Sequence, residues 1–138
     1  MSSTVSVAAE DVAAVQAVPA RMIAAWSKND ADAFADLFTE DGSMVLPGDV
    51  YLNTREEIRA FMSKAYAGPY QGTRVTGSPL SAKFINQDSG VLVTQGGVLY
   101  GDETDVTEAN KIRATWVLAK KDGAWFITAY HNSPVQTG

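Results

Sequence analysis

Residues 117–134 read VLAKKDGAWFITAYHNSP, in which two runs rich in β-branched and aromatic residues flank a Lys-Asp-Gly turn. This pattern is typical of a β-hairpin and predicts strands over 109–121 and 124–132. The same composition upstream predicts strands over 72–86 and 90–101. The second half of the chain is therefore expected to form a meander of four long antiparallel strands.

The first half of the chain has helical periodicity. Apolar residues recur at steps of three and four between residues 11 and 26, which predicts an amphipathic helix. Further helices are predicted over 31–38 and over 55–66, the latter behind a capping box formed by Thr54 and Glu57. Three helices followed by four long strands predict an α+β domain.

Composition narrows the possible functions. The chain has 138 residues, a formal net charge of −5, no run of basic residues and no cysteine. Nucleic-acid and anionic membrane partners are therefore not expected, and neither disulfides nor thiolate sites can form. We expect one domain over 11–134 between flexible ends at 1–10 and 135–138. The first residues resemble neither a signal peptide nor a membrane span, so a cytoplasmic location is expected.

Two segments resemble a known superfamily. AAWSKNDADAFADLFTEDGSMV (24–45) resembles the helix–turn–helix segment and Asp-containing turn of nuclear transport factor 2-like (SnoaL-like) proteins, and 117–134 resembles their closing hairpin. The ending AYHNSP is most similar to the SgcJ-like proteins of enediyne polyketide biosynthesis. The resemblance implies three N-terminal helices packed in a curved, mostly antiparallel sheet. This cone-shaped, cystatin-like α+β barrel would enclose an apolar pocket.

His131 is the single histidine and the first catalytic candidate. Strict strand alternation places it on one face with Trp125, Ile127 and Ala129, toward the expected pocket. A general acid or base role is one interpretation, and hydrogen bonding at the pocket or strand end is another. Asp41 is the candidate carboxylate partner, since the resembling family often has a functional carboxylate there. The turn Asp41-Gly42 explains the same residue without any catalysis.

The remaining candidates are residues expected to line the pocket. Arg113 and Thr115 either supply polar contacts there or face the less buried side of the sheet. The pocket set is Met22, Trp26, Met44, Phe61, Tyr66, Tyr100, Arg113, Thr115, Trp125, Ile127 and Asn132. With one histidine, no cysteine and no glycine-rich dinucleotide motif, no metal and no cofactor are expected.

Three functions fit these observations. The first is a pocket protein of secondary metabolism that binds a polyketide-like apolar intermediate and assists its processing in enediyne biosynthesis. The second is a cofactor-free acid/base enzyme, a cyclase, dehydratase or isomerase, that uses His131. The third is an assembly module that docks a larger polyketide synthase. A homodimer is expected under all three, because a sheet of this size needs its outer face covered.

Overall fold

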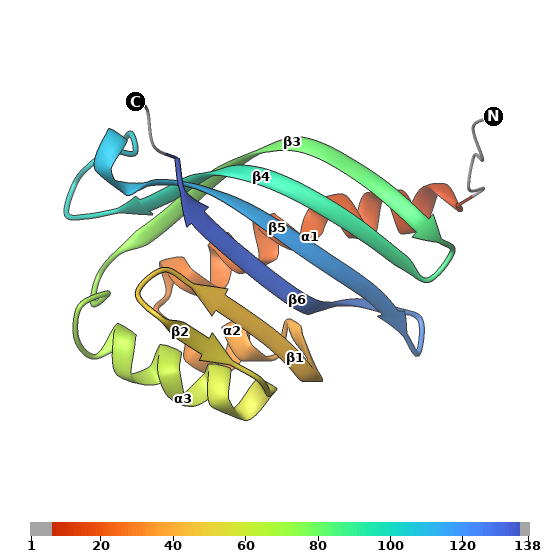
Figure 1. Ribbon diagram of the computed structural model, residues 1–138, viewed down its shortest axis with the longest axis horizontal. Helices are drawn as coiled ribbons and strands as arrows, with labels where there is room; N and C mark the ends of the chain where they lie inside the picture. The colour runs from red at the N-terminus through yellow and green to blue at the C-terminus, as the bar shows by residue number, and fades with distance from the viewer. Residues whose placement is uncertain (1–6, 136–138) are drawn as a thin grey trace.

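The computed structural model describes residues 7–135. These residues form an α+β domain in which three helices pack against one six-stranded sheet (Figure 1). Expectations for 1–6 and 136–138 lie outside these residues, and the first helix begins inside the segment that was predicted to be flexible. The elements are α1 (Ala9–Ser27), α2 (Ala31–Ala35), β1 (Phe38–Leu46), β2 (Val50–Leu52), α3 (Arg55–Tyr66), β3 (Arg74–Asn86), β4 (Ser89–Leu99), a short 3₁₀ turn (Glu108–Asn110), β5 (Lys111–Lys121) and β6 (Ala124–Pro134).

The strands form a single curved sheet in the order β2-β1-β6-β5-β4-β3. Strands β3 to β6 make the predicted antiparallel meander, while β1 pairs in parallel with β6. The helices lie on the concave side, with α1 beneath the long strands and α3 beside β1 and β2 (Figure 1). This arrangement confirms the predicted α+β class with three helices packed in a curved sheet. Among the described residues, none of the helices is long and apolar enough to cross a membrane.

Local signals explain where the helices begin. The Asp30 carboxylate accepts a hydrogen bond from Ala33 N–H at 3.0 Å and caps α2. At α3, the Thr54 hydroxyl accepts from Glu57 N–H at 3.1 Å, and the Glu57 carboxylate accepts from Asn53 N–H at 2.8 Å. The predicted capping box therefore forms, with its return bond made one residue earlier than the motif implies.

The segment between α2 and β2 differs from its prediction. The second helix ends at Ala35 rather than at residue 38, and β1 begins at Phe38 and continues through Asp41 and Gly42. Those residues form an irregularity inside the strand, because the pairing with β6 shifts between Phe38 and Ser43. A Cβ atom on Gly42 would approach the Thr39 carbonyl to 3.0 Å and the Ile127 carbonyl to 3.2 Å, so a side chain here would crowd the backbone and the close packing favours glycine.

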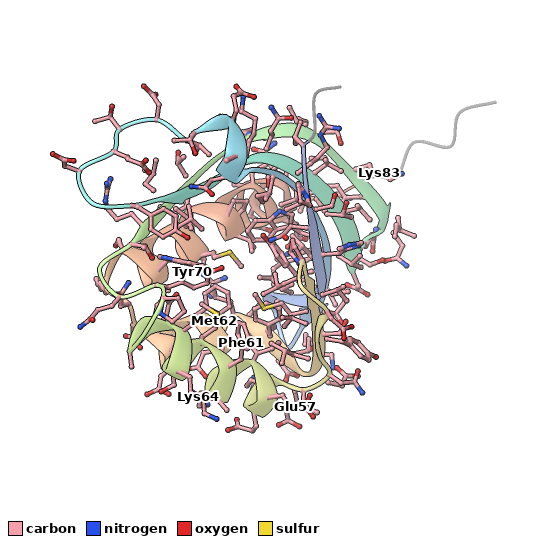
Figure 2. All side chains as sticks on the ribbon, turned by 60° about the vertical axis from the view of Figure 1, so that its left-hand side comes forward. Glu57, Phe61, Met62, Lys64, Tyr70 and Lys83 are labelled. Atoms are coloured by element: carbon pink, nitrogen blue, oxygen red, sulfur yellow. The ribbon has the colours of Figure 1, made fainter. Side chains whose placement is uncertain are left out.

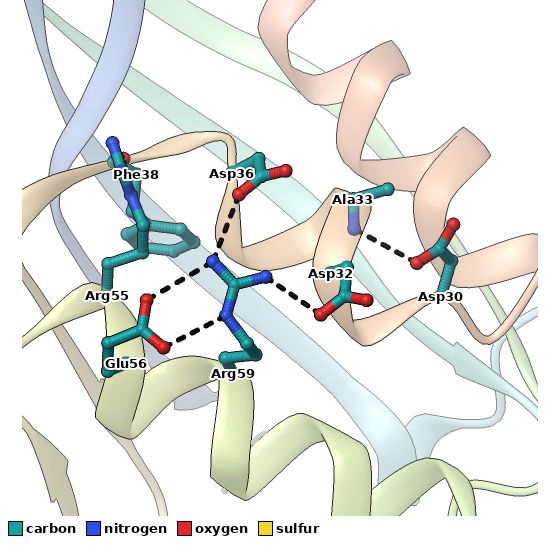
Figure 3. A network of polar contacts seen from close by, with 8 residues as sticks. All are labelled: Asp30, Asp32, Ala33, Asp36, Phe38, Arg55, Glu56 and Arg59. Carbon is teal, nitrogen blue, oxygen red and sulfur yellow. Dashed lines mark hydrogen bonds and ion pairs between the residues drawn. The ribbon is translucent and has the colours of Figure 1, made fainter.

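Two arginines fix α3 against its neighbours. Arg55 donates two hydrogen bonds to the Phe38 carbonyl, at 2.9 and 2.7 Å, which tie the helix to β1. Arg59 makes ion pairs with Asp32 at 2.8 Å and Asp36 at 3.1 Å, and it also pairs with Glu56 on its own helix (Figure 3). The carboxylates raise the pKa of Arg59. These contacts set the position of the helix that forms one wall of the cavity described next.

Candidate functional site

A cavity of about 400 Å³ lies between the concave face of the sheet, α1 and α3. In Figure 2, Phe61, Met62 and Tyr70 lie inside the ring formed by helices and sheet, whereas Glu57 and Lys64 of α3 point outward. A cavity of this volume is in the range typical of small-molecule sites. The fold therefore provides the pocket that the resemblance implies.

Part of the predicted pocket set lines this cavity. The helices contribute Met22, Trp26 and Phe61, and the strands and loops contribute Met44, Tyr100 and Asn132. Trp26 is held in place by a hydrogen bond from its indole N–H to the Thr73 hydroxyl at 2.8 Å. Its ring also packs edge-on against Tyr66. Met22, Trp26 and Phe61 thus lie on the helix faces that the apolar periodicity marks as inward.

Three predicted pocket residues are buried elsewhere. Ile127 is fully buried in the core, and the Trp125 indole N–H donates to the Asp11 carboxylate at 3.0 Å, which joins β6 to α1. This bond and one from Lys120 lower the pKa of Asp11. Tyr66 packs behind Trp26, where burial raises the pKa of its phenol and its hydroxyl has no hydrogen-bond partner in the described part of the chain.

Two other predicted pocket residues lie on the outer face. Arg113 and Thr115 are exposed and alternate with the buried Ala114 and Trp116. Arg113 donates to the Gln95 side chain at 2.9 Å on the neighbouring strand. Of the two interpretations left open for this pair, the structure supports the less buried side of the sheet.

The prediction that His131 faces the pocket is wrong. Register along β6 shifts at Thr128, because Leu118 pairs with Ile127 whereas the adjacent Val117 pairs with Ala129. One extra residue reverses the alternation beyond it, so Trp125 and Ile127 are followed on the concave side by Tyr130 and Asn132. His131 is exposed and pairs with Val45 of β1 on the outer side of the sheet.

Asp41 does not join His131 either. Its carboxylate is exposed and accepts a hydrogen bond from the Thr39 hydroxyl at 2.9 Å, close to where β1 is irregular. Within residues 7–135, no hydrogen bond or ion pair connects Asp41 with His131. The pair is therefore not assembled as an acid/base unit in this structure.

Of the polar groups on the sheet wall of the cavity, the sequence predicted Asn132 but not Thr94, Trp116 or Tyr130. Trp116 donates from its indole N–H to the Thr94 hydroxyl at 3.0 Å, and both residues line the cavity. Asn132 donates from Nδ2 to the Tyr130 hydroxyl at 3.1 Å. The Trp116 and Tyr130 rings meet edge-on with centroids 5.0 Å apart. Alternation along β5 offered a signal for Trp116, since Ala114 and Leu118 on the same face are buried and apolar.

The wall is neutral at ordinary pH. Burial raises the pKa of Tyr130 to about 12, and the neighbouring Tyr70 phenol adds to this rise. Burial also raises the pKa of Tyr70, with a contribution from Tyr100. Among the described residues that line the cavity, none is Asp, Glu, Lys, Arg or His. The site can therefore enclose an uncharged molecule and offer it hydrogen bonds, but it lacks a side chain that titrates near neutral pH.

No group of three His, Cys, Asp or Glu side chains within 7–135 is arranged to hold a metal ion. The polar lining consists of hydroxyl and amide groups from threonine, tyrosine and asparagine. Such a lining can orient a small organic molecule through hydrogen bonds.

Solved structures share this architecture. A domain of unknown function with a cystatin-like fold from Nostoc punctiforme superposes with a TM-score of 0.86 at 25% identity, covering 94% of this chain and 80% of that one. An NTF2-like protein from Novosphingobium aromaticivorans gives 0.78 at 18% identity, with 94% and 84% covered. An uncharacterized cystatin-like protein from Caulobacter vibrioides gives 0.77 at 22% identity, with 92% and 91% covered. These likenesses establish the cystatin-like, nuclear transport factor 2-like fold.

No curated protein matches the chain. The sequence pattern of one protein family does match, over residues 7–131, which is most of the chain and includes all the residues that line the cavity except Asn132 and Pro134. The description of that family is "SnoaL-like domain". The chain therefore belongs to the SnoaL-like domain family.

Proposed function

We propose that the protein binds a neutral, largely apolar small molecule of polyketide-like character in the cavity and assists its processing without a cofactor. The observation that carries this proposal is the lining. It combines aromatic and aliphatic side chains with a few hydroxyl and amide groups, and none of the described lining residues is charged. A charged ligand would lose its hydration on entry and meet no counter-charge, so the site favours uncharged molecules.

Membership of the SnoaL-like family is consistent with this ligand class, because polyketide cyclases belong to the same superfamily. A precursor of an enediyne would be one such molecule, and this finer assignment draws on the resemblance of residues 117–134 alone. The acid/base alternative that uses His131 is less well supported, since that side chain lies outside the cavity. Homodimer formation stays a prediction that light scattering of the purified protein would test, and docking to a synthase stays a prediction as well.

A matched pair of substitutions on β4 tests the proposal. Val98 lines the cavity, whereas Val93 lies between the inward-facing Leu92 and Thr94 and therefore faces outward. Val98→Trp should fill the cavity, and Val93→Trp adds the same side chain on the other face. Titration with N-phenylnaphthylamine, a neutral apolar dye, should show binding to the wild type and to Val93→Trp but much weaker binding to Val98→Trp. Equal binding by both variants would show that the dye does not enter the cavity.

A further inference from the structure

Two hydroxyl groups on the sheet side of the cavity, those of Thr94 and Tyr130, each accept one hydrogen bond from within residues 7–135 and donate none to them. Thr94 accepts from Trp116 Nε1 at 3.0 Å, and Tyr130 accepts from Asn132 Nδ2 at 3.1 Å. In the described part of the chain, neither hydroxyl donates a hydrogen bond to another protein group. Each hydroxyl therefore keeps its one proton to donate, together with a second lone pair, and the buried Asn132 Oδ1 beside Tyr130 is an acceptor without a partner among the described residues.

In a second tryptophan–threonine pair, Trp26 and Thr73, the threonine hydroxyl both accepts and donates a hydrogen bond within the protein. The Thr73 hydroxyl accepts from Trp26 Nε1 at 2.8 Å and donates to the Tyr70 carbonyl at 2.7 Å. Thr73 does not line the cavity, and its hydroxyl is fully used within the protein. Thr94 has the same kind of partner on one side but faces the cavity on the other, which leaves its donor to a ligand.

The two donors lie close together on one wall. Across the sheet, Thr94 pairs with Ala114, and Ala114 pairs with Asn132, so the three residues form a row over β4, β5 and β6. Tyr130 lies one step along from Asn132 on the same concave face, against the Trp116 ring. A single bound molecule can therefore reach both hydroxyls, since adjacent strands are about 4.8 Å apart.

We propose that Tyr130 and Thr94 select ligands that present carbonyl oxygens, such as ketones or esters, to their hydroxyl protons. This inference rests on the proposed function and names the chemical class that the cavity recognises. A carbonyl oxygen accepts hydrogen bonds and carries no charge, so it satisfies both donors without the desolvation that a carboxylate would suffer. A polyketide chain carries such oxygens at regular intervals. An apolar molecule without an acceptor would leave both donors unpaired in a dry site.

Two dyes of the same shape test this inference. One is propionyl-dimethylaminonaphthalene, a neutral ketone whose emission shifts to the red when its carbonyl accepts a hydrogen bond. The other is the matched propyl compound, in which CH₂ replaces the carbonyl. The wild type should bind the ketone more tightly and shift its emission to the red. Tyr130→Phe should weaken ketone binding by about three- to tenfold and reverse part of the shift, while leaving binding of the propyl dye unchanged.

Further variants separate recognition from damage to the fold. Thr94→Ser keeps the hydroxyl and should bind the ketone as the wild type does, whereas Thr94→Val should weaken it by a similar three- to tenfold factor. Tyr51→Phe, on an exposed tyrosine, should change nothing. Equal affinity of the wild type for both dyes, unaffected by Tyr130→Phe, would overturn the carbonyl inference and leave the proposed cavity function standing. Failure of both dyes to bind would overturn that function and this inference together.

Discussion

Alkaline unfolding of a Tyr130→Phe variant tests whether the cavity wall is as dry as the structure indicates. Burial raises the pKa of Tyr130 from the ordinary 10.0 to about 12. Below pH 10 the phenol is protonated in both the folded and the unfolded chain, so its contribution to stability is complete. Between pH 10 and about 12 the unfolded chain loses this proton while the folded chain keeps it, so the free energy of unfolding falls as pH rises.

The size of the effect follows from the shift. Two pKa units correspond to about 3 kcal/mol of unfolding free energy. The wild type loses this amount through Tyr130 as the pH rises from 10 to 12, with a slope of at most about 1.4 kcal/mol per pH unit. The Phe variant lacks this loss. At pH 8 it should be less stable than the wild type by about 1 kcal/mol, because Asn132 loses its hydrogen-bond partner. The difference in stability between the two proteins should therefore change sign at strongly alkaline pH.

Urea unfolding followed by far-ultraviolet circular dichroism, at several pH values from 8 to 12, measures both curves. Tyr51→Phe serves as the control, because Tyr51 is 66% exposed and this substitution should leave the slope of the wild type unchanged. Other titrating groups such as Tyr66 are common to all three proteins and cancel in the comparison, whereas the interaction of Tyr70 with Tyr130 is lost together with the Tyr130 phenol and forms part of the measured difference. Parallel curves for the wild type and Tyr130→Phe above pH 10 would refute the claim that the phenol is held neutral by burial.

Three further predictions concern single features. Gly96→Ala should destabilise the fold by about 2 to 3 kcal/mol in urea unfolding, because its Cβ would overlap a carbonyl of β3. Gly77→Ala, directly opposite in register, would bring its Cβ no closer than 3.7 Å to the Gln95 carbonyl, an ordinary contact, and should cost less than about 1 kcal/mol; equal losses would contradict the packing argument. Thr54→Ala removes the α3 cap and should cost about 1 kcal/mol in the same assay, whereas Thr54→Ser should not. His131→Gln should leave affinity for the ketone dye unchanged, while Asn132→Ala should lower it about threefold; equal effects of the two neighbours would contradict their opposite faces.

Local signals explain how much of the fold could be predicted. The helix at 55–66 has both its capping box and its apolar face within one short segment, and the structure reproduces its bounds. The four long strands are separated by turns that the sequence marks clearly, and their bounds agree to within about two residues. The parallel pairing of β1 with β6 has no comparable signal, because it joins segments about ninety residues apart.

The helical part of the candidate site was easier to predict than the strand part. An amphipathic helix shows its buried face directly, so Met22, Trp26 and Phe61 could be identified without knowing the sheet. A strand in a two-sided sheet shows two faces, and which of them is concave depends on how the whole sheet curves. Trp116 was recognised as belonging to the more apolar face of its strand, but the sequence did not indicate that its indole would orient Thr94.

The bulge in β6 accounts for the largest error and also for the character of the cavity. At Thr128 both neighbouring strands change register, and Thr39 of β1 contacts Thr128 through their hydroxyls at 3.4 Å. Below this point the concave side of β6 carries Trp125 and Ile127, which close the core. Beyond it the same side carries Tyr130, which lines the cavity.

A regular strand would instead have placed His131, an ionisable imidazole, on the concave side and the Tyr130 phenol in water. Bulges bend strands and redirect the side chains that follow them. The one added residue at Thr128 therefore bends β6 and turns Tyr130, in place of His131, toward the cavity. Strict alternation cannot reveal this change. The nearest sequence signal is that Tyr130 follows Ile127 by three residues, which breaks the period of two. The choice between a titratable site and a neutral, hydrogen-bond-donating one is thus made by backbone geometry at Thr128.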